Sequence, residues 1–251
     1  MTDAYQTPES NLVNENQPTG NYGSVEKALR GEYEFSIGDI LSEAWAKTNG
    51  SKWEFQLGFF YYFLVVIGLM IVLGIAMAGV VMASQDPTDI ILVQIFTQLG
   101  VNLIAMPMIM GLVIMGVRRS VDTPINAGMV FKYFSKMLPL FITMIFVYLM
   151  VIIGLMLLVI PGIYLMMAYY MAMPLVVEKG MSPWQAMETS RKAITHRWFS
   201  VFGLLLVMMV ILTISMIPLG IGMIWTLPMM MIVYGIMYRN MFGVEVETIA
   251  A

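Results

Sequence analysis

Long apolar runs that contain no charged side chain constrain this chain more than any other feature. They cover residues 55–83, 90–117, 138–160, 163–177, 198–217 and 219–238. Because a helix of about 20 apolar residues crosses a bilayer, we predict an all-α, polytopic membrane bundle of six transmembrane helices. Hydrophobic residues make up 59% and charged residues 12% of the chain, against about 45–50% and about 25% in soluble domains. This composition excludes a soluble globular enzyme, a disordered chain and a nucleic-acid-binding protein.

The fourth run is the shortest, since a helix over 163–177 reaches only about 22 Å at 1.5 Å per residue. Pro161 and Gly162 separate it from the third run. The segment either spans a thinned membrane or forms a hairpin that enters and returns. We favour the spanning helix.

The basic residues predict the orientation of the chain in the membrane. All 13 Lys and Arg residues lie before the first run, after the second, after the fourth or at the C-terminal end. The connections around Asp86, Pro161 and Pro218 contain none. Because cytoplasmic loops carry an excess of Lys and Arg, both termini are predicted to be cytoplasmic.

Residues 1–33 are polar and rich in Asn, Gln, Pro and Gly, with no apolar core that would suggest a signal peptide. We expect a disordered cytoplasmic tail here, followed by a membrane domain over 34–251. The alternative is that the tail docks onto a partner.

A Ser or Thr stands three residues before an Asp, Asn or Gln at three places: Ser36 and Asp39, Thr123 and Asn126, Ser182 and Gln185. This spacing is typical of a capping box, in which the hydroxyl accepts a hydrogen bond from a free backbone N–H. Each pair precedes an odd-numbered span. We therefore predict helices lying in the membrane interface at 36–49, 124–136 and 182–196.

The second span of each pair also carries a proline in its predicted cytoplasmic half, at Pro107, Pro174 and Pro228. A proline inside a helix removes a hydrogen bond and kinks the helix. The chain therefore reads as three copies of one unit, which consists of an interfacial helix and two spans. Internal repeats of this kind are common in transport folds and also occur in simple scaffolds.

The segments Leu158–Tyr164, Met173–Gly180 and Ser182–Ala186 resemble a prokaryotic membrane family. That family is related to the membrane domain of glycerophosphodiester phosphodiesterases and includes stand-alone inner-membrane proteins. The likeness is strongest over about 150–205. It implies a bacterial inner-membrane location and six spans. It brings no catalytic residues, since no soluble region is present that could form the phosphodiesterase domain.

No Asp, Glu, Lys, Arg or His lies inside any run. A proton relay or an intramembrane acid–base catalyst would need such a residue. We therefore expect no enzyme activity, no catalytic residues and no cofactor.

The most polar feature of the spans is a stripe on the second one. Gln94, Gln98 and Asn102 recur every four residues and share one helix face, with Thr97 beside them. We expect this stripe to point into the bundle. It would either form hydrogen bonds between helices or line a path for water, a solute or a lipid head group.

Methionine is unusually frequent, at 28 residues. Thioether ligands suit Cu(I), but Cys is absent and His occurs once. We interpret the methionines as flexible packing residues and predict no metal site.

Two functional hypotheses follow. In the first, a non-enzymatic inner-membrane protein contacts lipids or organises partner membrane proteins or further copies of itself. Its head-group contacts would be the basic residues Arg118, Arg119, Lys132, Lys136, Arg191, Lys192 and Arg197. In the second, the face of the second span that carries Gln94, Gln98 and Asn102 lines a channel or facilitator for a small uncharged solute or a lipid.

Overall fold

The computed structural model describes residues 22–84 and 86–250, and all regular secondary structure in these ranges is helical. Five segments are long and apolar enough to cross a membrane: Lys52–Val80, Pro87–Ser120, Ala127–Leu157, Val159–Glu178 and Trp198–Met216. The chain is therefore an all-helical membrane protein. α10 (Met223–Phe242) has 20 residues but is not one of these five segments, so the sixth span stays a prediction.

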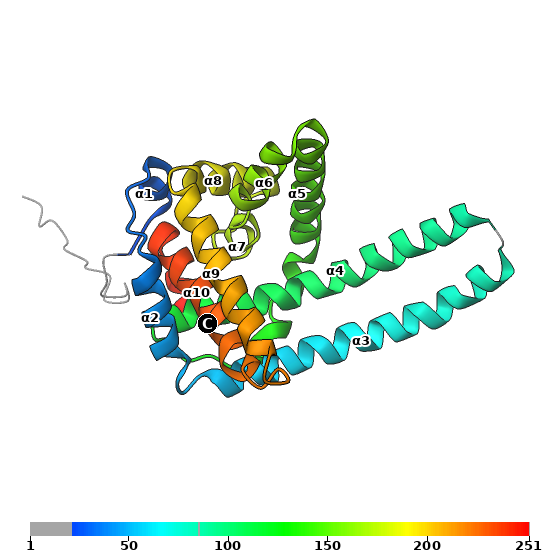
Figure 1. Ribbon diagram of the computed structural model, residues 1–251, viewed down its shortest axis with the longest axis horizontal. Helices are drawn as coiled ribbons and strands as arrows, with labels where there is room; N and C mark the ends of the chain where they lie inside the picture. Colours follow the sequence, from blue (N-terminus) through cyan, green and yellow to red (C-terminus); the bar gives the residue numbers. More distant parts are fainter. Residues whose placement is uncertain (1–21, 85, 251) are drawn as a thin grey trace, which may run out of the picture.

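Figure 1 shows the arrangement of the helices. They are α1 (Val25–Arg30), α2 (Ile37–Thr48), α3 (Lys52–Ala83), α4 (Pro87–Ser120), α5 (Met137–Leu157), α6 (Val159–Ala168), α7 (Ala172–Glu178), α8 (Pro183–Thr195), α9 (Trp198–Met216) and α10. Two 3₁₀ helices, η1 (Ala127–Phe131) and η2 (Phe134–Lys136), precede α5, and α11 (Val246–Ala250) follows α10. Helices α3, α4, α5 and α9 begin and end within three residues of the predicted runs.

α10 begins four residues later than predicted. Leu219 and Gly220 have φ angles of 53° and 80°, a left-handed conformation that cannot continue a right-handed helix. The connection from α9 therefore turns over 217–222, and the helix starts after it.

The core lies where the second half of α4 crosses α10. Gly116 and Gly235 stand at this crossing, where a Cβ on Gly116 would collide with the backbone of Met231. A Cβ on Gly235 would in turn collide with the backbone of Gly116. The two helices therefore pack backbone against backbone, an approach that only glycine permits.

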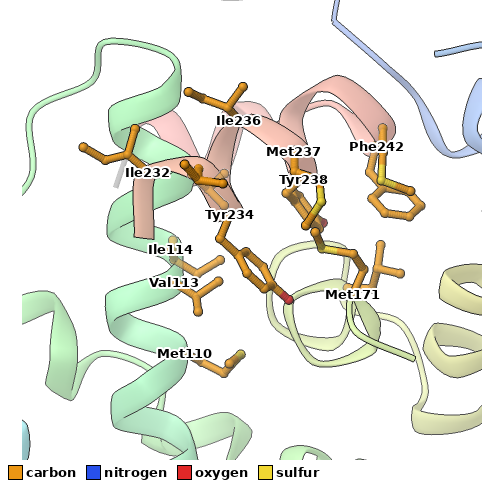
Figure 2. Close-up of a cluster of buried hydrophobic side chains, with 14 of the residues drawn as sticks. Met110, Val113, Ile114, Met171, Ile232, Tyr234, Ile236, Met237, Tyr238 and Phe242 are labelled. Carbon is orange, nitrogen blue, oxygen red and sulfur yellow. The ribbon is translucent and has the colours of Figure 1, made fainter. Parts of the chain in front are cut away.

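Methionines fill much of this core. Met108, Met115 and Met171 are fully buried, and so are Met237 and Met241 of α10. Figure 2 shows Met171 beside Tyr238 of α10, and Met110 next to Val113 on α4. An unbranched thioether adapts to irregular gaps, which accounts for these buried methionines. Others, such as Met82 and Met156, are 86% and 81% exposed.

The outer parts of α3 and α4 form a hairpin that projects from the remaining helices (Figure 1). None of the most apolar stretch of α3 is buried inside the protein. Side chains such as Val72 and Ile75 are 64% and 72% exposed. An apolar surface of this extent is typical of contact with lipid or with another membrane protein.

Part of the predicted disordered tail is ordered. Residues 1–21 lie outside the described residues, but Ser24 caps α1 by accepting a hydrogen bond from the N–H of Lys27 at 3.2 Å. Tyr33 is buried, and its hydroxyl donates to the carbonyl oxygen of Ala193 at 2.8 Å. Burial raises the pKa of Tyr33 to about 12. The prediction missed this segment because Ala28 and Tyr33 are too few to form a local pattern, and they are stabilised by α8.

Two of the three predicted caps are present. The hydroxyl of Ser36 accepts from the N–H of Asp39, and that of Ser182 accepts from the N–H of Gln185, both at 3.4 Å. They begin α2 and α8 close to the predicted positions 36–49 and 182–196.

The segment 124–136 differs from the prediction, because it forms η1 and η2 rather than one α-helix. Asn126, and not Thr123, caps η1 by accepting from the N–H of Gly128 at 2.7 Å. The carboxylate of Glu54 on α3 accepts from the N–H of Ala127 at 2.8 Å. In one continuous α-helix over this segment, the N–H groups of Ala127 and Gly128 would bond to backbone carbonyl oxygens. Here the side chains of Glu54 and Asn126 accept from them instead.

The fourth segment is a broken helix. α6 and α7 are separated by a turn over 169–171, and together they form the candidate span Val159–Glu178. Ser190 of α8 fills the break, since its hydroxyl donates to the carbonyl oxygen of Ala168 at 2.7 Å and accepts from the N–H of Met171 at 3.1 Å. The turn between the third and fourth segments falls at Leu158, which is extended, and not at 161–162.

The prolines occupy two kinds of position. Pro107 and Pro228 lie inside the continuous helices α4 and α10. Pro174 lies in the first turn of α7, where its missing N–H leaves no hydrogen bond unmade. Pro161 has the same place in α6.

Candidate functional site

The largest apolar hollow among those described lies between α6 and α9. It has a volume of about 610 Å³ and is lined only by apolar surface, from Ile160, Ile163, Tyr164, Trp198, Phe199 and Phe202. Trp198 stacks on Phe202, with ring centroids 5.2 Å apart and an angle of 7° between the planes. The indole N–H of Trp198 donates to the carbonyl oxygen of Tyr164 at 3.3 Å. The groove between α6 and α9 therefore has aromatic walls, in which a stack and a hydrogen bond hold the ring of Trp198.

One end of the groove is polar and basic. The hydroxyl of Tyr164 lies 2.7 Å from that of Thr195, at the end of α8. Arg191 of α8 forms two hydrogen bonds with Glu188, at 2.8 and 2.7 Å. The hydrogen bonds to Glu188 raise the pKa of Arg191, and hydrogen bonding to Tyr164 raises it further. The guanidinium group is therefore charged at any physiological pH, close to Tyr164.

Lys192, the next residue of α8, is a second cation beside Glu188. Its ammonium group lies 3.4 Å from Glu188, and its side chain is 55% exposed. The hydrogen bond from Arg191 holds the pKa of Glu188 below its usual value. Two cations thus share one carboxylate, which leaves a net positive charge at the polar end.

A second polar region surrounds Arg239 of α10. Its guanidinium donates to the carboxylate of Glu43 at 2.7 and 2.9 Å and to the carbonyl oxygen of Ser120 at 2.5 Å. Tyr22 lies against it, with the ring centroid 4.9 Å away. A neighbouring cavity of about 540 Å³ contains both acidic and basic side chains. These bonds join α2, α4 and α10 and neutralise the guanidinium.

Glu178 lies at the end of α7 with a fully buried side chain. Its carboxylate accepts from the hydroxyl of Tyr238 at 2.9 Å and from the N–H of Glu245 at 2.5 Å. Lys179 lies 3.4 Å away and also pairs with Glu245 at 2.6 Å. The sequence pattern did not reveal this cluster, because Glu178 directly follows an apolar run and its partners are about 60 residues later in the chain.

The predicted head-group residues do not form one surface. Arg118 donates to the carbonyl oxygens of Pro124 and Thr248, at 3.1 and 2.8 Å, and is 8% exposed. Arg119 donates to the carbonyl oxygens of Lys47 and Asn49. Both guanidinium groups therefore hold backbone segments together. Lys132, Lys192 and Arg197 are exposed, whereas Lys136 and Arg191 are half-buried.

The polar stripe of α4 does not point into the bundle. Gln94 and Gln98 are exposed, and Thr97 and Asn102 are half-buried. The side chain of Asn102 donates to the carbonyl oxygen of Gln98 on its own helix, at 2.8 Å. The expected direction was wrong because the outer half of α4 leaves the body of the protein, so that no other helix within 22–84 and 86–250 covers this face.

Comparison of the chain with protein-family models, with curated proteins and with solved structures finds no match. The fold defines the class as an all-helical membrane protein. The resemblance to the membrane domain of glycerophosphodiester phosphodiesterases stays a prediction.

Proposed function

We propose that this chain is a non-enzymatic protein of the bacterial inner membrane that binds anionic phospholipid. In this proposal both termini are cytoplasmic, and α8 lies at the cytoplasmic surface of the membrane. The observation that carries the proposal is the groove between α6 and α9, which joins an apolar, aromatic wall to the cations Arg191 and Lys192. Basic pockets between transmembrane helices on the cytoplasmic side are typical binding sites for anionic head groups.

The two parts of the groove have different roles. An acyl chain in a bilayer is already out of water, so the aromatic wall selects by shape and contributes little hydrophobic free energy. The affinity comes from the head group, with about 1 kcal/mol for each basic residue near the membrane surface. Tyr164 and Thr195 add hydroxyl groups at the same end.

The test is native mass spectrometry after reconstitution into vesicles of phosphatidylglycerol and phosphatidylcholine. The unmodified protein is expected to retain phosphatidylglycerol at a fixed stoichiometry. The double variant Arg191→Gln, Lys192→Gln is expected to retain it about tenfold less, because Glu188 already offsets part of the positive charge.

The matched control is Lys132→Gln, Lys136→Gln, which removes the same charge from the segment of η1 and η2. It is expected to retain the lipid as the unmodified protein does. Equal retention by both double variants would overturn the proposal.

Passage of a solute along Gln94 and Gln98 has less support. These side chains lie on an open helix face, and the described cavities lie on other elements. A channel needs an enclosed polar path, which one exposed face does not form.

A further inference from the structure

The outer half of α4 carries two amide side chains that lack a protein partner. Gln94 and Gln98 are exposed, and within residues 22–84 and 86–250 neither side chain takes part in a hydrogen bond. Their neighbours Ile91 and Ile95 are also exposed, at 57% and 48%. The face is therefore a polar ridge with apolar flanks, on the hairpin that projects in Figure 1.

The position along α4 places the ridge at membrane depth. Asp89 and Arg118 stand at the two ends of the helix, about 43 Å apart at 1.5 Å per residue. A hydrocarbon core of about 30 Å, centred between them, begins about 7 Å from each charge. Gln98 lies about 13 Å along the helix from Asp89, which puts it inside the core. Asn102 is near the middle.

The ridge faces away from α3. Gly100 marks the side of α4 that contacts α3, because a Cβ there would lie 3.8 Å from Leu73. Gln98 is two residues earlier and therefore about 160° around the helix from Gly100. Gln94 is within about 40° of Gln98 on the same face. The partner of α4 in the hairpin therefore does not cover these amides.

We propose that this face of α4, defined by Gln94 and Gln98, is the contact between two copies of this chain. A carboxamide both donates and accepts, so two identical amides satisfy each other. Copies inserted in one orientation and related by a two-fold axis along the membrane normal bring equal residues together at equal depth. Gln98 thus meets Gln98 of the second copy. Each such bond in a membrane contributes about 0.6–2 kcal/mol.

The apolar flanks fit the same partner. Ile91 and Ile95 are exposed on either side of the amides and pack against their counterparts in the second copy. This surface is separate from the groove between α6 and α9, and it does not depend on lipid binding.

The chain has no cysteine, so disulfide cross-linking can test the proposal directly. Gln98→Cys in its own membrane is expected to give a disulfide-linked species of twice the chain mass upon oxidation. The matched control is Phe96→Cys, which is on the same hairpin at nearly the same depth. Phe96 is 64% exposed but lies about 160° around α4 from Gln98. It is expected to stay monomeric.

A second experiment keeps the cysteine away from the central amide. Gln94→Cys is expected to cross-link as well, and adding Gln98→Leu is expected to lower its yield about 3- to 30-fold, which corresponds to the loss of one amide bond. Helix content, measured by circular dichroism, verifies that the variants are folded. Equal cross-linking of Gln98→Cys and Phe96→Cys would overturn the proposal. So would a cross-linked species of another mass, or a monomeric mass of the native protein in vesicles.

Discussion

At the scale of single residues, two glycines set how closely the central helices approach. Gly116 of α4 lies against the backbone of Met231, and Gly235 of α10 lies against that of Gly116. Backbone atoms cannot move aside in the way that the end of a flexible side chain can. An added methyl group therefore separates the helices along the part of α4 that carries the core.

We predict that Gly116→Ala lowers the free energy of unfolding by about 3 kcal/mol, the upper end of the usual cost of overpacking, because the added methyl group meets backbone atoms. Unfolding in mixed detergent micelles, followed by circular dichroism, measures the change. The control is Gly68→Ala on α3, where an added Cβ meets nothing within 4 Å. A stability for Gly116→Ala equal to that of the control would contradict the close crossing.

At the scale of elements, the break between α6 and α7 depends on a residue from another helix. The hydroxyl of Ser190 on α8 donates to the carbonyl oxygen of Ala168 and accepts from the N–H of Met171. Ser190 is fully buried, so no water can replace it. The broken helix and α8 therefore form one unit, which also holds the groove between α6 and α9.

We predict that Ser190→Ala destabilises the protein by about 1–3 kcal/mol, because it leaves a buried N–H and a buried carbonyl oxygen without partners. Thermal unfolding in detergent measures the loss. Ser42→Ala is the control, since the hydroxyl of Ser42 is exposed and bonds only within its own helix. Faster hydrogen exchange confined to 168–178 would further support the assignment, whereas unchanged stability would argue against it.

At the scale of the whole molecule, many large apolar side chains face outward. The hairpin of α3 and α4 buries little of its surface within the chain, and side chains on α5 and α9 such as Met156 and Met209 are 81% and 64% exposed. A soluble protein would aggregate with such a surface. The membrane, or a second copy within it, therefore completes the packing of these helices.

The predicted orientation can be tested with cysteines, which are absent from the natural chain. Leu219→Cys lies in the turn between α9 and α10, and Lys132→Cys lies between η1 and η2. We expect a membrane-impermeant maleimide to label Leu219→Cys in right-side-out vesicles and Lys132→Cys only in inverted vesicles. Labelling of both from one side would show that the positive-inside prediction is wrong.

The apolar runs by themselves determined the helical class and the approximate bounds of α3, α4, α5 and α9. The physical reason is that a backbone in hydrocarbon must form its hydrogen bonds within its own helix, so composition and length are sufficient. The caps at Ser36 and Ser182 were predictable for a similar reason, because donor and acceptor are three residues apart.

Contacts between distant segments decided the rest. Ser190 bonds to the backbone at a break about 20 residues earlier in the chain. Glu54 caps η1, and the carbonyl oxygen of Ala193 accepts from the hydroxyl of Tyr33. None of these pairs has a local pattern. The direction of Gln94 and Gln98 depended on where α4 leaves the body of the protein, which periodicity does not encode. Only the tertiary structure shows that this polar face and the groove between α6 and α9 remain open to a partner.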